Sequence, residues 1–330
     1  MNTDNKLLVT SSPHVRTADD TRSIMLDVII SLLPALAAAV YFFGGRALVL
    51  TLVSVAFCVF FEWAYRKLMK KTNTIGDLSA VVTGMLLAFC LPVGSPYWMV
   101  AIGDFFAIVI VKQLYGGLGK NFVNPALAAR AFLFSFPVYM STWAASMTRA
   151  PIFGAADAVT AATPLYYMST LGEIPKDFSL YQLFIGRVGG CIGEICTLAL
   201  ILGGVYLLLR RVITPRIPVA FIGVVALLTF VFPRGSAGRL EWMLYSIMSG
   251  GVFLGAIFMA TDYATSPVTK AGQWVYGAGC GALTVFIRYF GSYPEGVSYA
   301  ILIMNSCVWL IERVTVSRRY GCARKAGEAK

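Results

Sequence analysis

The chain has 330 residues, of which 58% are hydrophobic and only 13% are charged. A single soluble core cannot bury that much apolar surface, and many apolar runs approach the ~20 residues that cross a lipid bilayer. The net charge of +11 does not indicate nucleic-acid binding, because the basic residues stand at the ends of apolar runs.

In chain order, the sequence predicts an all-α, polytopic transmembrane helical bundle. A polar segment (1–23) precedes a transmembrane domain (24–313), and a basic tail (314–330) follows it. Apolar runs of sufficient length predict about ten membrane spans. These runs are 24–43, 47–65, 76–92, 96–115, 124–143, 182–209, 217–233, 240–260, 271–290 and 296–313. The long connection 144–181 separates the fifth run from the sixth, and connections of this length are commonly functional.

The distribution of basic residues orients the predicted bundle. Of the 27 Lys and Arg residues, 19 fall on the side of the two termini, seven fall on the opposite side, and Arg130 falls within a span. Because cytoplasmic loops carry the excess of Lys and Arg, we expect both termini in the cytoplasm and the loop 144–181 outside. The expected location is the bacterial cytoplasmic (inner) membrane, with lipid as the surroundings of the bundle.

A weak internal similarity predicts a repeat. Residues 84–96 read GMLLAFCLPVGSP and residues 255–267 read GAIFMATDYATSP, so the Gly and Ser-Pro positions coincide. The first copy follows a span that runs outward and the second follows a span that runs inward, which makes the predicted repeat an inverted one. Many membrane proteins with inverted repeats are transporters, so a solute channel or transporter without a redox role stays open as an alternative.

Six acidic residues lie within or near the spans. A charge at this depth is costly, so it usually faces the bundle interior, a partner or an ion path. Asp104 and Glu194 are candidates for an ion pathway, whereas the other four are interpreted as carboxylates with a local partner. Arg130 is a candidate counter-charge for one of them. The six acids are Asp27, Glu62, Asp77, Asp104, Glu194 and Asp262.

Residues that bind metals or redox clusters are sparse. His14 is the single histidine, and the seven cysteines include no Cys-x-x-Cys pair. We therefore expect no metal site and no iron–sulfur cluster, and we interpret the cysteines as buried structural residues. No glycine-rich nucleotide motif follows a soluble strand, so a Rossmann unit for NAD is not expected.

The predicted outer loop contains a small, threonine-rich segment. It reads DAVTAAT from Asp157 to Thr163, with Thr160 between them and Pro164 after them. Composition alone favours an ordinary polar loop in which Pro164 is a turn residue. The segment nevertheless resembles the flavinylation signature, Asp-x-x-Ser/Thr-Gly/Ala-Ala-Thr, of the family that contains the B component of Nqr and the D component of Rnf complexes. Ala161 stands here where glycine is commoner in that family.

The resemblance extends over nearly the whole chain. The B component of Nqr, a Na⁺-pumping quinone reductase, usually has a longer N-terminal extension, so the resemblance favours the Rnf type and leaves the Nqr type as the alternative. The segments that carry it, besides the loop, are 11–14, 25–28, 76–79, 83–84, 119–126 and 259–263.

This resemblance implies a membrane component of an ion-translocating oxidoreductase complex, catalytically incomplete alone, in which electrons pass between ferredoxin and NAD while Na⁺ or H⁺ is exported. The implied partners are the A, B, C, E and G components of Rnf and a separate flavin transferase. Thr163 is implied to carry covalent FMN as a phosphoester and to relay single electrons, with Asp157 and Thr160 in the recognition signature.

A second flavin is also implied by the resemblance. It is non-covalent, such as riboflavin, and the implied residues are Asn121 and Asn124. The sequence around them also has a plain structural interpretation, because Asn124 and Pro125 are the residue types preferred as the N-cap and the first residue of a helix.

Overall fold

The computed structural model describes residues 20–141, 143–144, 147, 151–152, 163–175, 178–234, 238–291 and 295–316. Within these ranges the regular elements are helices, which confirms the predicted all-α fold. The predicted segments 1–23 and 314–330 lie almost entirely outside the described residues.

Two long helices open the chain, α1 (Thr21–Phe43) and α2 (Gly45–Leu68). The turn between them needs Gly44, whose φ of 80° is unfavourable for other residues. Both helices are long and apolar enough to cross a membrane, yet only 28% and 33% of their most apolar windows are buried. Apolar helices that stay this exposed fit a lipid environment, in which an apolar surface carries no penalty.

Shorter elements complete the first half. They are η1 (Ile75–Asp77), α3 (Ser79–Phe89), α4 (Tyr97–Phe105) with its π-helical continuation η2 (Phe106–Gln113), α5 (Pro125–Leu133) and α6 (Pro137–Met140). Within the predicted outer loop lie α7 (Pro164–Tyr166) and η3 (Tyr167–Leu171), and α8 (Leu180–Ile185) begins at its end.

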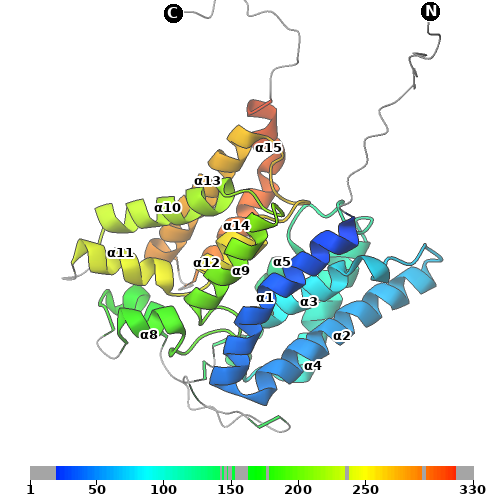
Figure 1. Ribbon diagram of the computed structural model, residues 1–330, viewed down its shortest axis with the longest axis horizontal. Coiled ribbons are helices and arrows are strands. Elements are labelled where there is room, and N and C mark those ends of the chain that lie inside the picture. The colour runs from blue at the N-terminus through cyan, green and yellow to red at the C-terminus, as the bar shows by residue number, and fades with distance from the viewer. Residues whose placement is uncertain are drawn as a thin grey trace, which may run out of the picture.

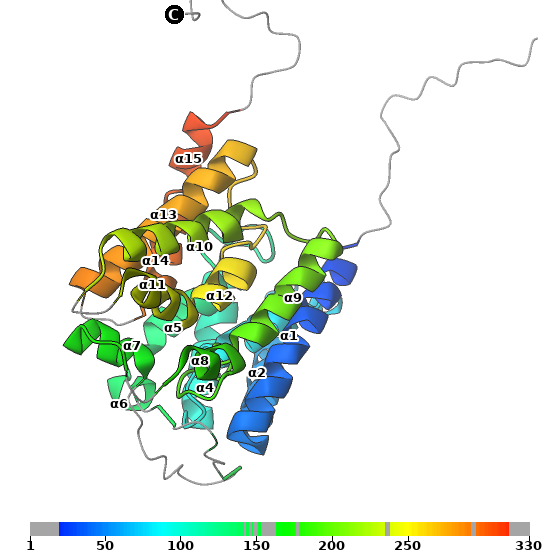
Figure 2. The same ribbon diagram turned by 60° about the vertical axis from the view of Figure 1, so that its left-hand side comes forward.

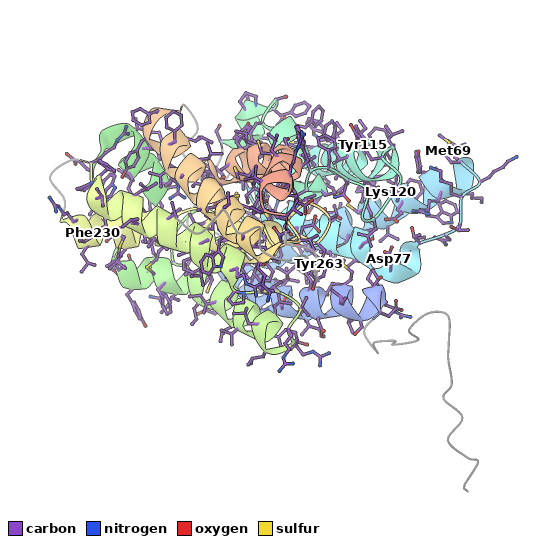
Figure 3. All side chains as sticks on the ribbon, turned by 90° about the horizontal axis from the view of Figure 1, so that it is seen from above. Met69, Asp77, Tyr115, Lys120, Phe230 and Tyr263 are labelled. Carbon is purple, nitrogen blue, oxygen red and sulfur yellow. The ribbon has the colours of Figure 1, made fainter. Side chains whose placement is uncertain are left out.

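The second half consists of α9 (Thr197–Leu209), α10 (Arg216–Val231), α11 (Arg239–Met248), α12 (Val252–Leu254) with η4 (Gly255–Met259), α13 (Lys270–Phe290), α14 (Val297–Ser306) and α15 (Val308–Val314). The two halves lie beside one another, with α9 against α1 (Figures 1 and 2). Figure 3 shows the two halves from above. One half contains Met69, Asp77 and Lys120, the other contains Phe230, and Tyr263 lies between them.

The start of the first described helix and the end of the last one lie on the same side of the molecule. In Figures 1 and 2, α1 begins and α15 ends towards the top, whereas α6, α7 and α8 lie at the bottom. Thr163, the N-cap of α7, therefore lies at the end of the bundle away from the start of α1 and the end of α15, as the charge distribution predicts for the loop 144–181. The cytoplasmic location of the termini stays a prediction.

Four predicted spans are not the continuous helices that the apolar runs suggested. The run 182–209 divides into α8 and α9, and the run 240–260 bends by 62° between α11 and α12. The run 124–143 is interrupted between α5 and α6, and the run 296–313 bends by 54° between α14 and α15. Glycines permit the first two breaks, since Gly186 and Gly250 have φ angles of 105° and 71°.

Hydropathy alone does not reveal these breaks, because the residues around them remain apolar. By length and composition, two described helices qualify as spans, or up to four if each bent pair counts as one span. The number of about ten spans stays a prediction.

Two buried arginines donate to backbone carbonyls that lie outside the helices or near a helix end. Arg46 donates to the carbonyls of Val93 at 2.8 Å and Pro151 at 2.8 Å. Arg288 donates to the carbonyls of Ser246 at 2.6 Å and Ser249 at 3.0 Å, at the end of α11. In a lipid environment, non-helical backbone is tolerated only where such internal partners exist.

The two similar sequence segments have the same order of structure. Gly84 lies in α3, which ends at Phe89 and is followed by a non-helical stretch and then α4. Gly255 begins η4, which ends at Met259 and is followed by a longer non-helical stretch and then α13. This shared order supports the predicted repeat.

Candidate functional site

A cavity lies where α5–α8 meet the end of α11 and the start of α14. Its volume is about 480 Å³. Aromatic side chains form much of its lining, namely those of Phe134, Trp143, Tyr166 and Tyr299. A cavity of this size, largely apolar with a few polar groups, has the character of a small-molecule site.

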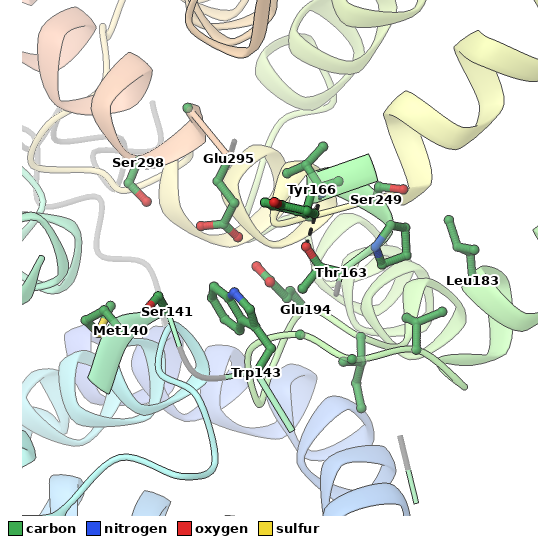
Figure 4. A pocket seen from close by; sticks show the side chains of 18 of the residues that line it. Met140, Ser141, Trp143, Thr163, Tyr166, Leu183, Glu194, Ser249, Glu295 and Ser298 are labelled. Carbon is green, nitrogen blue, oxygen red and sulfur yellow. Dashed lines mark hydrogen bonds between the residues drawn. The ribbon is translucent and has the colours of Figure 1, made fainter. Parts of the chain in front are cut away.

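Thr163 lines this cavity and is the N-cap of α7. Its Oγ1 accepts a hydrogen bond from the backbone N–H of Tyr166 at 3.2 Å (Figure 4). Pro164 follows as the first helical residue, so the sequence folds as a capped helix start. The hydroxyl therefore acts as an acceptor, and among the described residues its own hydrogen has no acceptor.

Four polar side chains line the same cavity, each with an oxygen atom that has no partner within the described part of the chain. These atoms are Oε2 of Glu194, Oε1 of Glu295, and Oγ of Ser249 and Ser298. Figure 4 shows the carboxyl groups of Glu194 and Glu295 turned towards one another beside Trp143 and Thr163. Since buried polar groups in folded proteins are rarely left without partners, these oxygens indicate a polar ligand or water.

Two arginines contact Glu295, one at its carboxylate and one at its backbone. Arg130, 2% exposed, forms an ion pair with Glu295, and its Nη2 lies 3.5 Å from the Cys191 sulfur. Arg288 donates to the backbone carbonyl of Glu295 at 3.2 Å. The other oxygen of Glu194 accepts from the backbone N–H of Cys191 at 3.1 Å.

The non-helical segment between α8 and α9 brings Glu194 to the site. The backbone N–H groups of Ile192 and Gly193 donate to the carbonyls of Leu91 at 3.0 Å and Phe89 at 2.9 Å, beyond the end of α3. A Cβ atom on Gly193 would lie 2.2 Å from the side chain of Phe89. Only glycine allows this approach, so Gly193 helps to position the neighbouring Glu194.

Cys191, Glu194 and Glu295 bring one ligand atom each to within 4.8 Å of one another. This is a grouping that a metal ion could use, and the sequence did not predict it. However, the guanidinium of Arg130 already supplies a positive charge to Glu295, and the Cys191 thiol donates to the carbonyl of Cys90 at 3.1 Å. The ion pair and the thiol hydrogen bond thus account for one oxygen of Glu295 and for Cys191, whereas Oε2 of Glu194 and Oε1 of Glu295 keep no partner among the described residues.

Asn121 and Asn124 line a second, smaller cavity of about 90 Å³ between α3, α5 and η4. Asn124 is the N-cap of α5, because its Oδ1 accepts from the N–H groups of Ala126 at 3.0 Å and Leu127 at 3.3 Å. Its Nδ2 donates to the carbonyl of Met259 at 3.3 Å. The plain structural prediction for Asn124 and Pro125 is therefore confirmed.

The remaining predicted acids have partners of different kinds. Asp27 binds Tyr206 and Arg210, and Glu62 forms a buried ion pair with Lys112 at 2.8 Å. Asp77 and Asp262 accept from residues two or three positions further along the chain, which confirms the local interpretation for these two. Asp104 is buried in α4, apart from Glu194.

Several predicted site residues are not brought together. Asp157 and Thr160 lie outside the described residues, so their relation to Thr163 stays a prediction. Arg130 is a counter-charge as expected, but its partner is Glu295, an acid that the sequence left in a loop. Three residues were missed because they stand near helix ends that only the tertiary structure brings to one place: Glu295, Ser249 and Ser298.

Comparison with known proteins places this chain in a family. The model of the NQR2, RnfD, RnfE family matches residues 8–321. The chain is 48% identical to the D component of a Na⁺-translocating ferredoxin:NAD⁺ oxidoreductase complex of Acetobacterium woodii, covering 98% of each chain. It is 42% identical to the D component of a proton-translocating ferredoxin:NAD⁺ oxidoreductase complex of Clostridium ljungdahlii, covering 97% of this chain and 98% of that relative.

A further relative has a more general name. It is the D component of an ion-translocating oxidoreductase complex of Stutzerimonas stutzeri, 38% identical over 90% of this chain and 91% of that relative. The names of the first two relatives differ in the translocated ion, although both are similar to this chain over nearly its whole length.

Proposed function

Because the chain belongs to the NQR2, RnfD, RnfE family, we propose that it is the membrane component, of the D type, of an ion-translocating ferredoxin:NAD oxidoreductase complex. The near-complete overlap with both relatives supports the same role in a comparable complex. The all-helical, apolar fold is consistent with a membrane component. The other components of the complex are the expected partners.

Within this function, the protein carries FMN esterified to Thr163. The observation that carries the proposal is the position of Thr163 on the rim of the 480 Å³ cavity, with an available hydroxyl hydrogen. Esterification replaces that hydrogen and leaves the oxygen as the cap of α7. The loop signature from Asp157 to Thr163 supports the same residue.

The residues around the cavity fit an FMN group. Its volume falls within the range of ~300–1,000 Å³ that is usual for ligand pockets. Trp143 and Tyr166 offer apolar surfaces for a flat ring, and the unpartnered oxygens of Glu194, Ser249 and Ser298 offer acceptors for its N–H groups or for bound water.

A flavin supplies one-electron chemistry when bound, whereas the protein supplies its position and surroundings. Thr163 is a tether in this proposal, not an acid or a base. The ion pair with Arg130 offsets the charge of Glu295, whereas Glu194 keeps one oxygen without a partner among the described residues. A covalent bond is useful on the predicted outer face, because a dissociated flavin would diffuse away.

A second, non-covalent flavin near Asn121 and Asn124 is a separate part of the proposal. The present cavity of about 90 Å³ is smaller than usual ligand pockets, so a riboflavin-sized molecule requires the surrounding helices to separate. The unpartnered Oδ1 of Asn121 supports a polar ligand there.

The covalent site is tested by ultraviolet fluorescence of the denatured protein band after co-expression with a flavin transferase. The wild type and Thr163→Ser should fluoresce, Thr163→Ala should not, and the matched control Thr160→Ala should keep the label. The mass of the peptide that contains Thr163 identifies the adduct. A dark wild-type band would favour the alternative of a solute channel, and a fluorescent Thr163→Ala band would place the attachment elsewhere.

A further inference from the structure

Asp104 is a fully buried carboxyl group outside both cavities. It lies in α4, on a continuous helical stretch with η2, and its side chain is 0% exposed. The neighbouring Gly103 packs against Leu87 and Leu133, so the surroundings are largely apolar. A carboxyl group at such a position requires an explanation, because an isolated buried charge is very costly.

The hydrogen bonds at Asp104 determine where a proton lies. Oδ1 is 2.7 Å from the Ser54 hydroxyl oxygen and 3.2 Å from the Cys58 sulfur, whereas Oδ2 has no partner among the described residues. The same Ser54 oxygen is 2.9 Å from the carbonyl of Gly84 in α3. A hydroxyl group has one hydrogen, so Ser54 donates either to Gly84 or to Asp104, but not to both.

Protonation of Asp104 satisfies both contacts at once. The acid donates from Oδ1 to the Ser54 oxygen, and the Ser54 hydroxyl donates to the carbonyl of Gly84. With an ionised Asp104, one of these two short contacts would join two oxygens with no hydrogen between them. The weakly donating thiol of Cys58 and an unpartnered Oδ2 are too little to hold a buried negative charge.

Within the described part of the chain, no cation neutralises Asp104 in place of a proton. Of the elements packed against it, α2 presents Cys58 and Glu62, η2 presents Lys112, and α5 carries Arg130. Lys112 is engaged with Glu62 and Arg130 with Glu295. Helix α3 contributes no titratable side chain, as its sequence SAVVTGMLLAF shows. A hydrated metal cation is also disfavoured, because among the described residues the one oxygen hydrogen-bonded to Asp104 is that of Ser54, and neither cavity reaches the carboxyl group.

We propose that Asp104 is a proton-binding site, held as a neutral acid with its hydrogen on Oδ1 and able to release that proton. On release, the O–H bond of the acid breaks and the proton is accepted by bulk water, which a local opening of the helices must admit because neither cavity reaches Asp104. The Ser54 hydroxyl then turns from the carbonyl of Gly84 to Oδ1 and donates to the new carboxylate. Ser54, Cys58 and Glu62 follow one face of α2 at intervals of four residues, so the polar line continues from Asp104 to the Glu62–Lys112 pair.

The full-length protein in native membranes can be tested with dicyclohexylcarbodiimide, which modifies protonated carboxyl groups in apolar surroundings. Labelled peptides are quantified by mass spectrometry at a series of pH values. We expect Asp104 to be labelled at neutral pH at least tenfold more than Asp27 and Glu62, which are buried controls with cationic partners. Labelling should decline at alkaline pH and be absent in Asp104→Asn.

Two variants, Asp104→Asn and Ser54→Ala, separate the proton site from a packing effect. Ser54→Ala removes the acceptor and the switch but no charge, so Asp104 should remain labelled and lose its label only at a higher pH than in the wild type. Equal labelling of Asp27 and Asp104, or no label on Asp104 at neutral pH, would overturn the protonated state. Labelling that is independent of pH in a folded protein would overturn the release of the proton.

Discussion

Removal of Lys112 should reveal how strongly the interior of this bundle depends on charge pairing. The Lys112 ammonium lies 2.8 Å from Glu62 and 2.6 Å from the Ser79 hydroxyl, and both charged side chains are at most 2% exposed. In Lys112→Met the Glu62 carboxylate stays buried with Thr74 as its hydrogen-bond donor. Removing one partner of a buried ion pair typically costs ~3–5 kcal/mol, so we expect a loss of that size.

The assay is reversible unfolding in mixed micelles, which gives the free energy of unfolding directly. Replacing both partners, as in Glu62→Leu with Lys112→Met, should recover most of the loss, because no buried charge is then left without a partner. The matched control is Arg210→Met. Arg210 pairs with Asp27 but its side chain is 54% exposed, so its loss should cost about 1 kcal/mol or less. If Lys112→Met were no more destabilising than Arg210→Met, the inference from burial would be refuted.

Two further predictions concern packing and capping. A Cβ atom on Gly203 would lie 2.1 Å from the carbonyl oxygen of Ser31, whereas one on Gly223 meets nothing within 4 Å. Gly203→Ala should therefore separate α9 from α1 and lower the thermal stability in detergent. The control Gly223→Ala should be neutral or gain up to ~1 kcal/mol of stability from helix propensity. Equal effects of the two substitutions would contradict this account. Asn124→Ala should cost ~1–2 kcal/mol in the same unfolding assay, because the cap of α5 is lost. Asn124→Asp keeps the capping oxygen and should recover most of that stability. An equal loss in both variants would show that the bond to Met259 dominates.

The sequence was sufficient for features that depend on neighbours along the chain. Apolar runs predicted the first two helices to within a few residues, and Asn124-Pro125 predicted the start of α5 because a cap is a local device. The runs 182–209 and 240–260 contain interrupted helices, and the sequence did not show where they break. Their glycines are compatible with a helix and with a break, and packing against other helices decides between the two.

The candidate site shows the same division. Thr163 was found from the loop signature, and Glu194 was found because acids are rare in apolar runs. Glu295 was missed because its position next to Gly296 gave no sign that it would meet Arg130, which is 165 residues away in the chain. Similarly, the sequence identified Asp104 as an unusual acid, but its protonation follows from two oxygens on α2 and α3.

What the amino-acid sequence determined by itself is the chemical character of this protein: its apolar helices, the resemblance that identifies its family, and the threonine in the predicted outer loop. Only the tertiary structure decided where the helices break, which arginine meets which acid, and how Thr163 shares a cavity with buried oxygens. The physical reason is the range of the interactions. Hydrophobicity and capping act over a few residues, whereas ion pairs and orphaned backbone groups are satisfied by partners that folding brings from distant parts of the chain.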